Sequence, residues 1–188
     1  MPPSSGIGSS REAPESLRLA ILGNSGSGKT TLAHALAAHA SLPVLDLDTV
    51  AWVPGEIAVS RDAETAGADV REFCSAHEGW IVEGCYAGLV GVALEMGARL
   101  VFLEPGVEAC LAHCRARPFE PHKYASPEEQ DARLAFLLDW VRDYYVRDGD
   151  LSLREHRVLF DRHSGPKLLI DTALPVADLV RRVTALDE

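Results

Sequence analysis

The sequence contains no apolar run of the ~18 residues that a membrane-spanning helix requires, so we expect no membrane partner. It also has no apolar stretch near its start that could act as a secretory signal. Residues 1–16 are rich in Ser, Pro and Gly, and we expect them to form a flexible leader. Basic side chains are outnumbered, with 18 Lys and Arg against 28 Asp and Glu and a formal net charge of −10. This acidic balance argues against a protein that binds nucleic acids in general. We expect a cytoplasmic protein.

Cysteine is also scarce, with four residues at positions 74, 85, 110 and 114. Without a secretory signal, reduced thiols are the expected state. Cys110 and Cys114 are one helical turn apart with His113 between them, a spacing that could hold a metal. No second ligand pair of matching type follows, and free cysteine is among the most buried residue types. We therefore expect thiols packed in the core.

Apolar runs alternate with stretches of helical periodicity along the chain. Five short runs predict buried strands at 17–22, 43–48, 80–83, 99–103 and 167–170. Helices are predicted at 30–40, 61–77, 86–96, 107–117, 128–146, 153–163 and 176–186. Strands separated by helices in this way indicate an α/β fold in three α/β/α layers, with a parallel sheet covered on both faces. We expect one domain over residues 17–188.

The strongest motif spans residues 23–30, which read GNSGSGKT and match the P-loop (Walker A) pattern G-x-x-x-x-G-K-[ST]. The motif directly follows a predicted strand and directly precedes a predicted helix, as a P-loop requires. Its backbone N–H groups can surround phosphate oxygens, and the helix dipole adds positive potential. Lys29 is expected to reach the β- and γ-phosphates and Thr30 to bind Mg²⁺. The predicted nucleotide-binding residues are Gly23, Asn24, Ser25, Gly26, Ser27, Gly28, Lys29, Thr30 and Thr31.

A P-loop alone does not separate kinases from GTPases or motor ATPases. The sequence lacks the N-K-x-D guanine signature, and 188 residues leave no room for the coupling modules of a large mechanical ATPase. The helices predicted within 118–165 exceed a minimal sheet and could form a mobile cover. These features favour a small kinase acting on a small acceptor.

Acidic residues follow the predicted strands on the side where ligands bind in open α/β sheets. Asp46 and Asp48 end the second predicted strand, two residues apart and therefore on one side of it. We assign Asp46 to the magnesium shell and Asp48 to the acceptor hydroxyl. Glu83 ends the third strand beside Gly84, where a ligand can approach closely. Glu104 ends the fourth, where it either holds metal-bound water or caps the next helix.

Arginine is expected over the transferred group, because phosphoryl transfer spreads negative charge that a guanidinium stabilises. Arg115 and Arg117 end a predicted helix that leads into a Pro-rich loop, and Arg142 lies in the helix beyond it. A fold-back would bring this segment over the P-loop. We select Lys29, Asp48, Arg117 and Arg142 as candidate catalytic residues.

With these residues in view, the chain resembles the shikimate-kinase and adenylate-kinase branch of P-loop kinases. Within it, the chain is similar to small adenylate-kinase-like proteins labelled DNA topology modulation proteins. The resemblance rests on the P-loop, on Leu47 and Asp48 with Trp52, and on residues 80–84 with Tyr86. It implies a sheet of order 2-3-1-4-5, a helical lid at about 117–128, an acceptor region at about 49–79, and ATP with Mg²⁺. The implied acceptor contacts are Asp48, Trp52, Glu83, Gly84 and Tyr86.

The expected activity is ATP- and magnesium-dependent phosphoryl transfer to a small acceptor, either a nucleotide or a hydroxylated metabolite. Arg61 and Arg71 are the only arginines or lysines within 49–79, so the arginines that would bind a nucleoside monophosphate are not evident. The alternative is a nucleotide-binding regulator with weak turnover or none. A DNA-associated role follows from the family label alone, and the acidic charge speaks against it. We expect a monomer or a homodimer.

Overall fold

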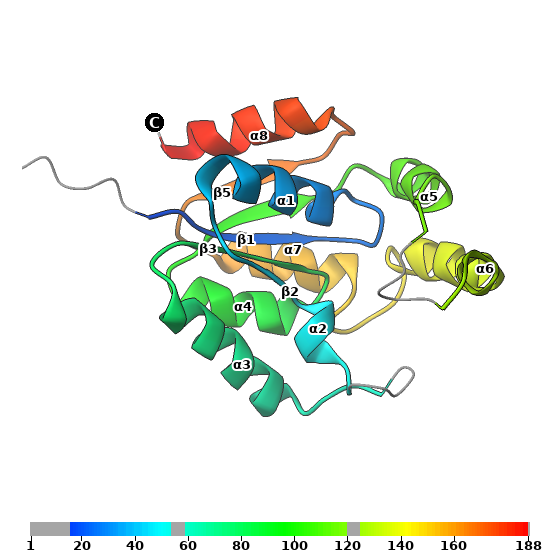
Figure 1. Cartoon of the computed structure of the whole chain (residues 1–188), viewed down its shortest axis with the longest axis horizontal. Helices are drawn as coiled ribbons and strands as arrows, with labels where there is room; N and C mark the ends of the chain where they lie inside the picture. Colours follow the sequence, from blue (N-terminus) through cyan, green and yellow to red (C-terminus); the bar gives the residue numbers. More distant parts are fainter. Residues whose placement is uncertain (1–15, 54–58, 120–124, 188) are drawn as a thin grey trace, which may run out of the picture.

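The computed structural model describes residues 16–53, 59–119 and 125–187, and its centre is a five-stranded parallel sheet (Figure 1). The strand order is β2-β3-β1-β4-β5, which confirms the expected topology. All four strand pairs are parallel. The P-loop strand β1 is therefore central, with β3 on one side and β4 on the other. The strands are β1 (Arg18–Gly23), β2 (Val44–Asp46), β3 (Trp80–Gly84), β4 (Arg99–Leu103) and β5 (Lys167–Ile170).

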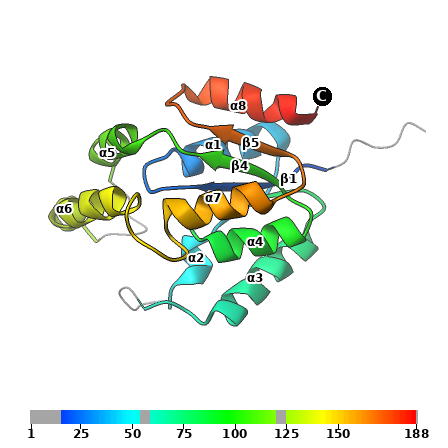
Figure 2. The same cartoon turned by 180° about the vertical axis from the view of Figure 1, so that it is seen from behind.

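Helices cover both faces of the sheet, as Figures 1 and 2 show. One face carries α1 (Lys29–Ala40) and α8 (Val176–Thr184), and the other carries α3 (Ala63–Ala76), α4 (Ala87–Glu95) and α7 (Leu153–Arg162). Successive side chains of a strand point to opposite faces. Accordingly Leu19 and Ile21 belong to the core under α1 and α8, whereas Ala20 and Leu22 belong to the core under the other three helices. The three-layer architecture is confirmed.

Two further helices, α5 (Val107–Arg115) and α6 (Pro127–Asp143), lie side by side beyond the end of β1 where the P-loop begins (Figure 1). They share a small core of their own, made by Cys110, Leu111, Cys114 and Val141. The expected lid at 117–128 connects them, and its residues 120–124 lie outside the described part of the chain. The expected leader also lies outside it, except for Ser16, whose hydroxyl donates to the carbonyl of Glu78 at 2.7 Å. No helix within the described ranges is long and apolar enough to span a bilayer.

The end of the second strand differs from the sequence expectation. The strand β2 ends at Asp46, and Asp48 opens the short helix α2 (Asp48–Ala51). The placement of both acids on one side of a strand is therefore wrong. The strand ends early because the chain turns after Asp46. Asp46 Oδ1 accepts from the backbone N–H of Asp48 at 2.9 Å and stabilises this turn. The backbone N–H of Leu47 donates to the carbonyl of Glu83 at 2.9 Å and ties this turn to β3.

Candidate functional site: a P-loop cleft

The P-loop backbone takes the form that its glycines permit. Gly26 and Gly28 have φ of 77° and 96°, which L side chains rarely adopt. A Cβ on Gly26 would also lie 2.4 Å from the carbonyl oxygen of Cys110, so α5 packs directly against the loop. His113 of the same helix also contacts the loop, with Nδ1 2.8 Å from the carbonyl oxygen of Gly26. The loop is thus a fixed concave backbone surface at the start of α1, where successive N–H groups can receive an anion.

Lys29 supplies the positive charge of this surface. Lys29 is only 8% exposed, and its Nζ donates to the carbonyl oxygen of Asn24 at 2.9 Å. The hydroxyl of Ser27 is buried with no hydrogen-bond partner among the described residues. A buried ammonium group is stable when an anion lies beside it. The loop, the ammonium group and the orphaned hydroxyl together fit a polyphosphate.

Thr30 and Glu83 form the polar contact between α1 and β3. The Thr30 hydroxyl donates to Glu83 Oε1 at 2.6 Å, and Glu83 is 2% exposed. Burial raises the pKa of Glu83, and the nearby Lys29 ammonium partly opposes this rise. Asp46 pairs with Glu83 in the parallel register of β2 and β3. The hydroxyl and carboxylates are therefore close neighbours at the same end of the sheet.

Magnesium fits this group of oxygen atoms. The described residues hold no cluster of three His, Cys, Asp or Glu that could chelate an ion alone. Mg²⁺ usually keeps several waters and takes one or two protein oxygens together with substrate phosphates. Thr30 would then hold the ion directly, and Asp46 and Glu83 would hold its water molecules. The ion would neutralise charge on the phosphates.

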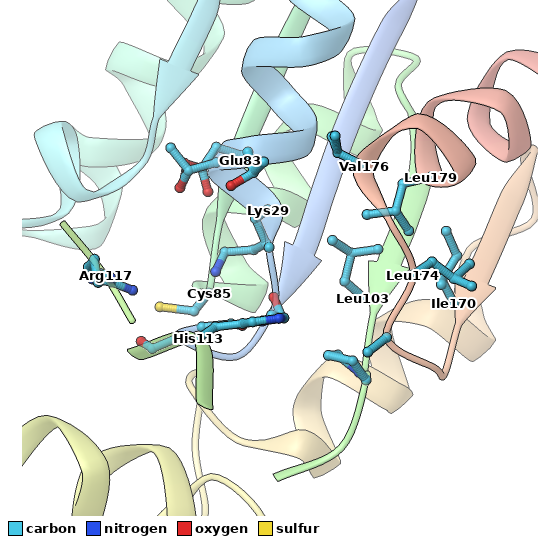
Figure 3. Close-up of a pocket in the computed structure, with 18 of the residues that line it drawn as sticks. Lys29, Glu83, Cys85, Leu103, His113, Arg117, Ile170, Leu174, Val176 and Leu179 are labelled. Atoms are coloured by element: carbon cyan, nitrogen blue, oxygen red, sulfur yellow. Dashed lines mark hydrogen bonds between the residues drawn. The ribbon is translucent and has the colours of Figure 1, made fainter. Parts of the chain in front are cut away.

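These groups open into a cleft of about 530 Å³. The volume lies within the range of about 300–1,000 Å³ that is usual for small-molecule sites. Figure 3 shows Lys29, Glu83 and Cys85 in one part of the cleft and an apolar group of side chains in the opposite part. The apolar wall comes from the end of β4 and from β5, α8 and the loop between them: Leu103, Ile170, Leu174, Val176 and Leu179.

The cleft brings together most of the predicted site residues. Its lining includes Ser25, Gly26, Ser27, Gly28, Lys29, Thr30, Thr31, Asp46, Asp48, Glu83, Gly84 and Arg117. Among the described residues it leaves out five predicted ones: Gly23, Asn24, Trp52, Tyr86 and Arg142. The side chain of Asn24 turns away from the cleft, and its Nδ2 donates to the carbonyl of Val141 in α6 at 3.0 Å.

Trp52 and Tyr86 lie behind Asp48. The hydroxyl of Tyr86 donates to Asp48 Oδ1 at 2.7 Å, and the indole Nε1 of Trp52 donates to the Tyr86 oxygen at 2.7 Å. Both aromatic residues were expected to contact the acceptor. That contact stays a prediction; in the structure Tyr86 contacts the Asp48 carboxylate and Trp52 contacts Tyr86.

The two candidate arginines occupy different places. Arg117 is half-buried and lines the cleft just after α5, as Figure 3 shows. Arg142 is exposed near the end of α6, where Nη1 donates to Asp139 Oδ1 at 2.7 Å. The structure does not bring Arg142 to the cleft as the described residues define it.

Three residues near the site were not among the sequence candidates. His113 and Cys85 line the cleft, and burial raises the pKa of the Cys85 thiol to about 12, so the thiol stays neutral. Arg147 follows α6, with its guanidinium 3.7 Å from the centre of the Trp140 ring and Nη2 donating to the Trp140 carbonyl at 3.0 Å. Its Nε and Nη1 are buried without a partner among the described residues. No motif marks these three residues.

The comparisons with known proteins give the class of fold. No family model matches the chain, and no curated protein matches its sequence. Among solved structures, a gluconokinase from Sinorhizobium meliloti 1021 is 18% identical, with a TM-score of 0.56 and coverage of 94% of this chain and 93% of that one. A sugar kinase from Janibacter sp. HTCC2649 is 17% identical, with a TM-score of 0.53 and coverage of 91% and 94%.

A shikimate kinase from Acinetobacter baumannii, solved with shikimate, is 21% identical, with a TM-score of 0.51 and coverage of 92% and 93%. These likenesses extend over nearly the whole of each chain. The protein therefore has the fold of P-loop small-molecule kinases. The narrower resemblance to DNA topology modulation proteins stays a prediction.

Proposed function

We propose that this protein is a kinase that transfers a phosphoryl group from ATP, with Mg²⁺, to a hydroxyl group of a small acceptor. The observation that carries the proposal is the meeting of two chemistries in one cleft. Lys29 and the P-loop can hold a polyphosphate there, and Asp48 lies in the same lining beside them. Such an arrangement suits positioning and charge stabilisation, which dominate catalysis of phosphoryl transfer.

The proposal gives separate roles to Lys29, Thr30, Asp48 and Arg117. Lys29 and the loop N–H groups bind the phosphates, and Thr30 binds the magnesium ion that neutralises them. The acceptor oxygen attacks the γ-phosphorus, the bond to the bridging oxygen of the β-phosphate breaks, and ADP leaves. Asp48 orients the acceptor hydroxyl and accepts its proton. Arg117 stabilises the charge on the transferred group from the side of α5.

The apolar wall supports the choice of a nucleotide as the donor. Leu103, Ile170, Leu174, Val176 and Leu179 lie at one end of the cleft, and Glu83 lies at the other (Figure 3). A flat nucleobase can pack against such a wall while its phosphates reach the loop. The other end, near Asp46, Asp48 and Glu83, is then left for the acceptor.

The charges of the acceptor region favour a hydroxylated metabolite over a nucleotide as the acceptor. Arg61 Nη1 donates to Asp69 Oδ2 at 2.6 Å and to the carbonyl of Val50 at 3.0 Å. Arg71 pairs with Glu95 of α4 at 3.6 Å. Both arginines of residues 49–79 are therefore engaged within the protein, whereas a nucleoside monophosphate would need cations for its phosphate.

A single assay tests the proposal. ADP release is measured with ATP and Mg²⁺ against a panel of sugars, sugar acids, polyols and nucleoside monophosphates. We expect turnover to rise steeply with one hydroxylated acceptor, and Asp48→Asn to lower that turnover by about 100-fold or more. Tight ATP binding with no acceptor-dependent turnover would instead support the nucleotide-binding regulator. Turnover that Asp48→Asn leaves unchanged would show that Asp48 has been given the wrong role.

A further inference from the structure

Trp52, Tyr86 and Asp48 form a chain of hydrogen bonds that ends at the cleft. Trp52 follows α2, and Tyr86 precedes α4 just after β3. The indole Nε1 lies 2.7 Å from the Tyr86 oxygen, which lies 2.7 Å from Asp48 Oδ1. The two aromatic rings meet edge to face with their centres 6.2 Å apart. The segment of Asp48 and Trp52 and the segment of Tyr86 are thus joined by these two hydrogen bonds.

The chemistry of the three groups fixes the direction of every hydrogen bond. An indole N–H can only donate, so the Tyr86 oxygen accepts from Trp52. The single hydroxyl proton of Tyr86 is then directed to Asp48. Burial raises the pKa of Tyr86, and the neighbouring Asp48 carboxylate raises it further, so the phenol keeps its proton. Asp48 is consequently held as a hydrogen-bond acceptor.

The two aromatic residues of this hydrogen-bond chain stand outside the cleft lining. Tyr86 is 8% exposed, and in the described part of the protein neither aromatic residue belongs to the cleft lining that includes Asp48. The aromatic groups therefore act on the acceptor through the carboxylate. An ionised carboxylate has about four lone-pair sites, so the bond from Tyr86 leaves capacity for an acceptor hydroxyl.

We infer that Tyr86, supported by Trp52, is a positioning residue that fixes the orientation of Asp48 for the transfer. This inference rests on the proposed kinase function and changes the expected role of both aromatic residues, from substrate contact to support of Asp48. Fixing the carboxylate from behind holds the acceptor hydroxyl in line with the bond to be broken. Small errors in such alignment have large effects on rate.

The test compares Tyr86→Phe with wild type in the presence of the acceptor that the panel identifies. We expect kcat to fall about 10- to 100-fold, while the Kd for ATP from calorimetry changes less than about twofold. Trp52→Phe leaves the hydrogen bond from Tyr86 to Asp48 in place and removes only the indole N–H that donates to Tyr86, so we expect a smaller loss of kcat. Tyr145→Phe is the matched control, because its hydroxyl donates to Glu104 Oε1 at 2.9 Å and neither residue lines the cleft in the described structure.

A double-mutant cycle separates positioning from a general structural role. If Tyr86 acts through Asp48, then Tyr86→Phe lowers kcat little further in an Asp48→Asn background. An equal loss in both backgrounds, or a wild-type kcat for Tyr86→Phe, would overturn the inference while leaving the kinase function intact. Wild-type protein without acceptor-dependent turnover would instead overturn the proposed function and this inference with it.

Discussion

The hydroxyl of Thr30, at the start of α1, donates to the buried carboxylate of Glu83, at the end of β3, over 2.6 Å. The contact joins the helix that follows the P-loop to the neighbouring strand. It also orients the side-chain oxygen that a P-loop uses to hold Mg²⁺. The hydroxyl that we propose for Mg²⁺ and the carboxylate that would hold metal-bound water are thus joined by one hydrogen bond.

Glu83→Gln should separate nucleotide binding from magnesium binding. Glutamine can still accept from Thr30, but it lacks the charge that attracts Mg²⁺ and its water. We expect ATP affinity in EDTA to stay within about twofold of wild type and the gain in affinity on adding Mg²⁺ to fall about tenfold. Calorimetry in both conditions measures this. An undiminished magnesium effect would remove Glu83 from the metal site.

Lys29→Ala should weaken ATP binding strongly. The substitution removes a buried ammonium group from the P-loop, and hydrogen bonds to charged groups contribute about 1.5–3 kcal/mol. We expect Kd to rise about 10- to 150-fold in calorimetry. Lys167→Ala is the control, because Lys167 Nζ donates to the carbonyls of Phe160 and Asp161 at the end of α7, away from the cleft. Similar affinity losses in both variants would contradict the assignment.

Arg117 and Arg142 provide a matched pair, because one lines the cleft and the other forms an ion pair with Asp139 on the surface of α6. We expect Arg117→Ala to lower kcat about 10- to 1,000-fold with a smaller effect on the Kd for ATP. Arg142→Ala should change kcat less than about threefold. A large kcat loss for Arg142→Ala alone would reverse the two roles.

His156 should make stability depend on pH. It is fully buried, with Nε2 2.8 Å from the Cys85 carbonyl oxygen and Nδ1 2.8 Å from the Tyr144 hydroxyl. The carbonyl can only accept, so Nε2 carries a proton, and in the neutral ring Nδ1 accepts from the Tyr144 hydroxyl. Burial lowers the pKa of His156 from 6.5 to about 4.

Between these two values the unfolded chain binds a proton that the folded protein does not. The free energy of unfolding is therefore highest above pH 6.5 and falls as the pH drops towards 4, by about 3 kcal/mol in total from this group. Urea unfolding at several pH values, compared between wild type and His156→Gln, measures the difference. If the free energy of unfolding falls equally with decreasing pH in the two proteins, His156 is not the group responsible.

The sequence predicted the sheet well because each strand carries a strong local signal. The runs around Ile21, Ile81 and Val101 are continuously apolar, as strands buried on both faces must be. The second strand was predicted too long for a local reason as well. The Asp46 side chain bonds to the backbone of Asp48 and starts a turn, a competition between side chain and backbone that apolar periodicity does not register.

The P-loop was predictable because its chemistry is encoded in consecutive residues. Spacing alone identified Lys29 and Thr30, and the fixed glycine of the motif, Gly28, takes the left-handed backbone form that glycine permits. The acceptor side was less predictable. Asp48 was found because it follows a strand, but the Tyr86 hydroxyl that donates to its carboxylate lies 38 residues away in the sequence.

The sequence by itself determined the succession of strands and helices along the chain. It also determined which residues can surround a polyphosphate, because both depend on neighbours along the chain. The tertiary structure decided which distant side chains face the cleft. It placed Arg117 in the lining and Arg142 outside it, and it put Tyr86 behind Asp48. These outcomes depend on how α4, α5 and α6 pack against the sheet, and packing brings together residues that no local pattern relates.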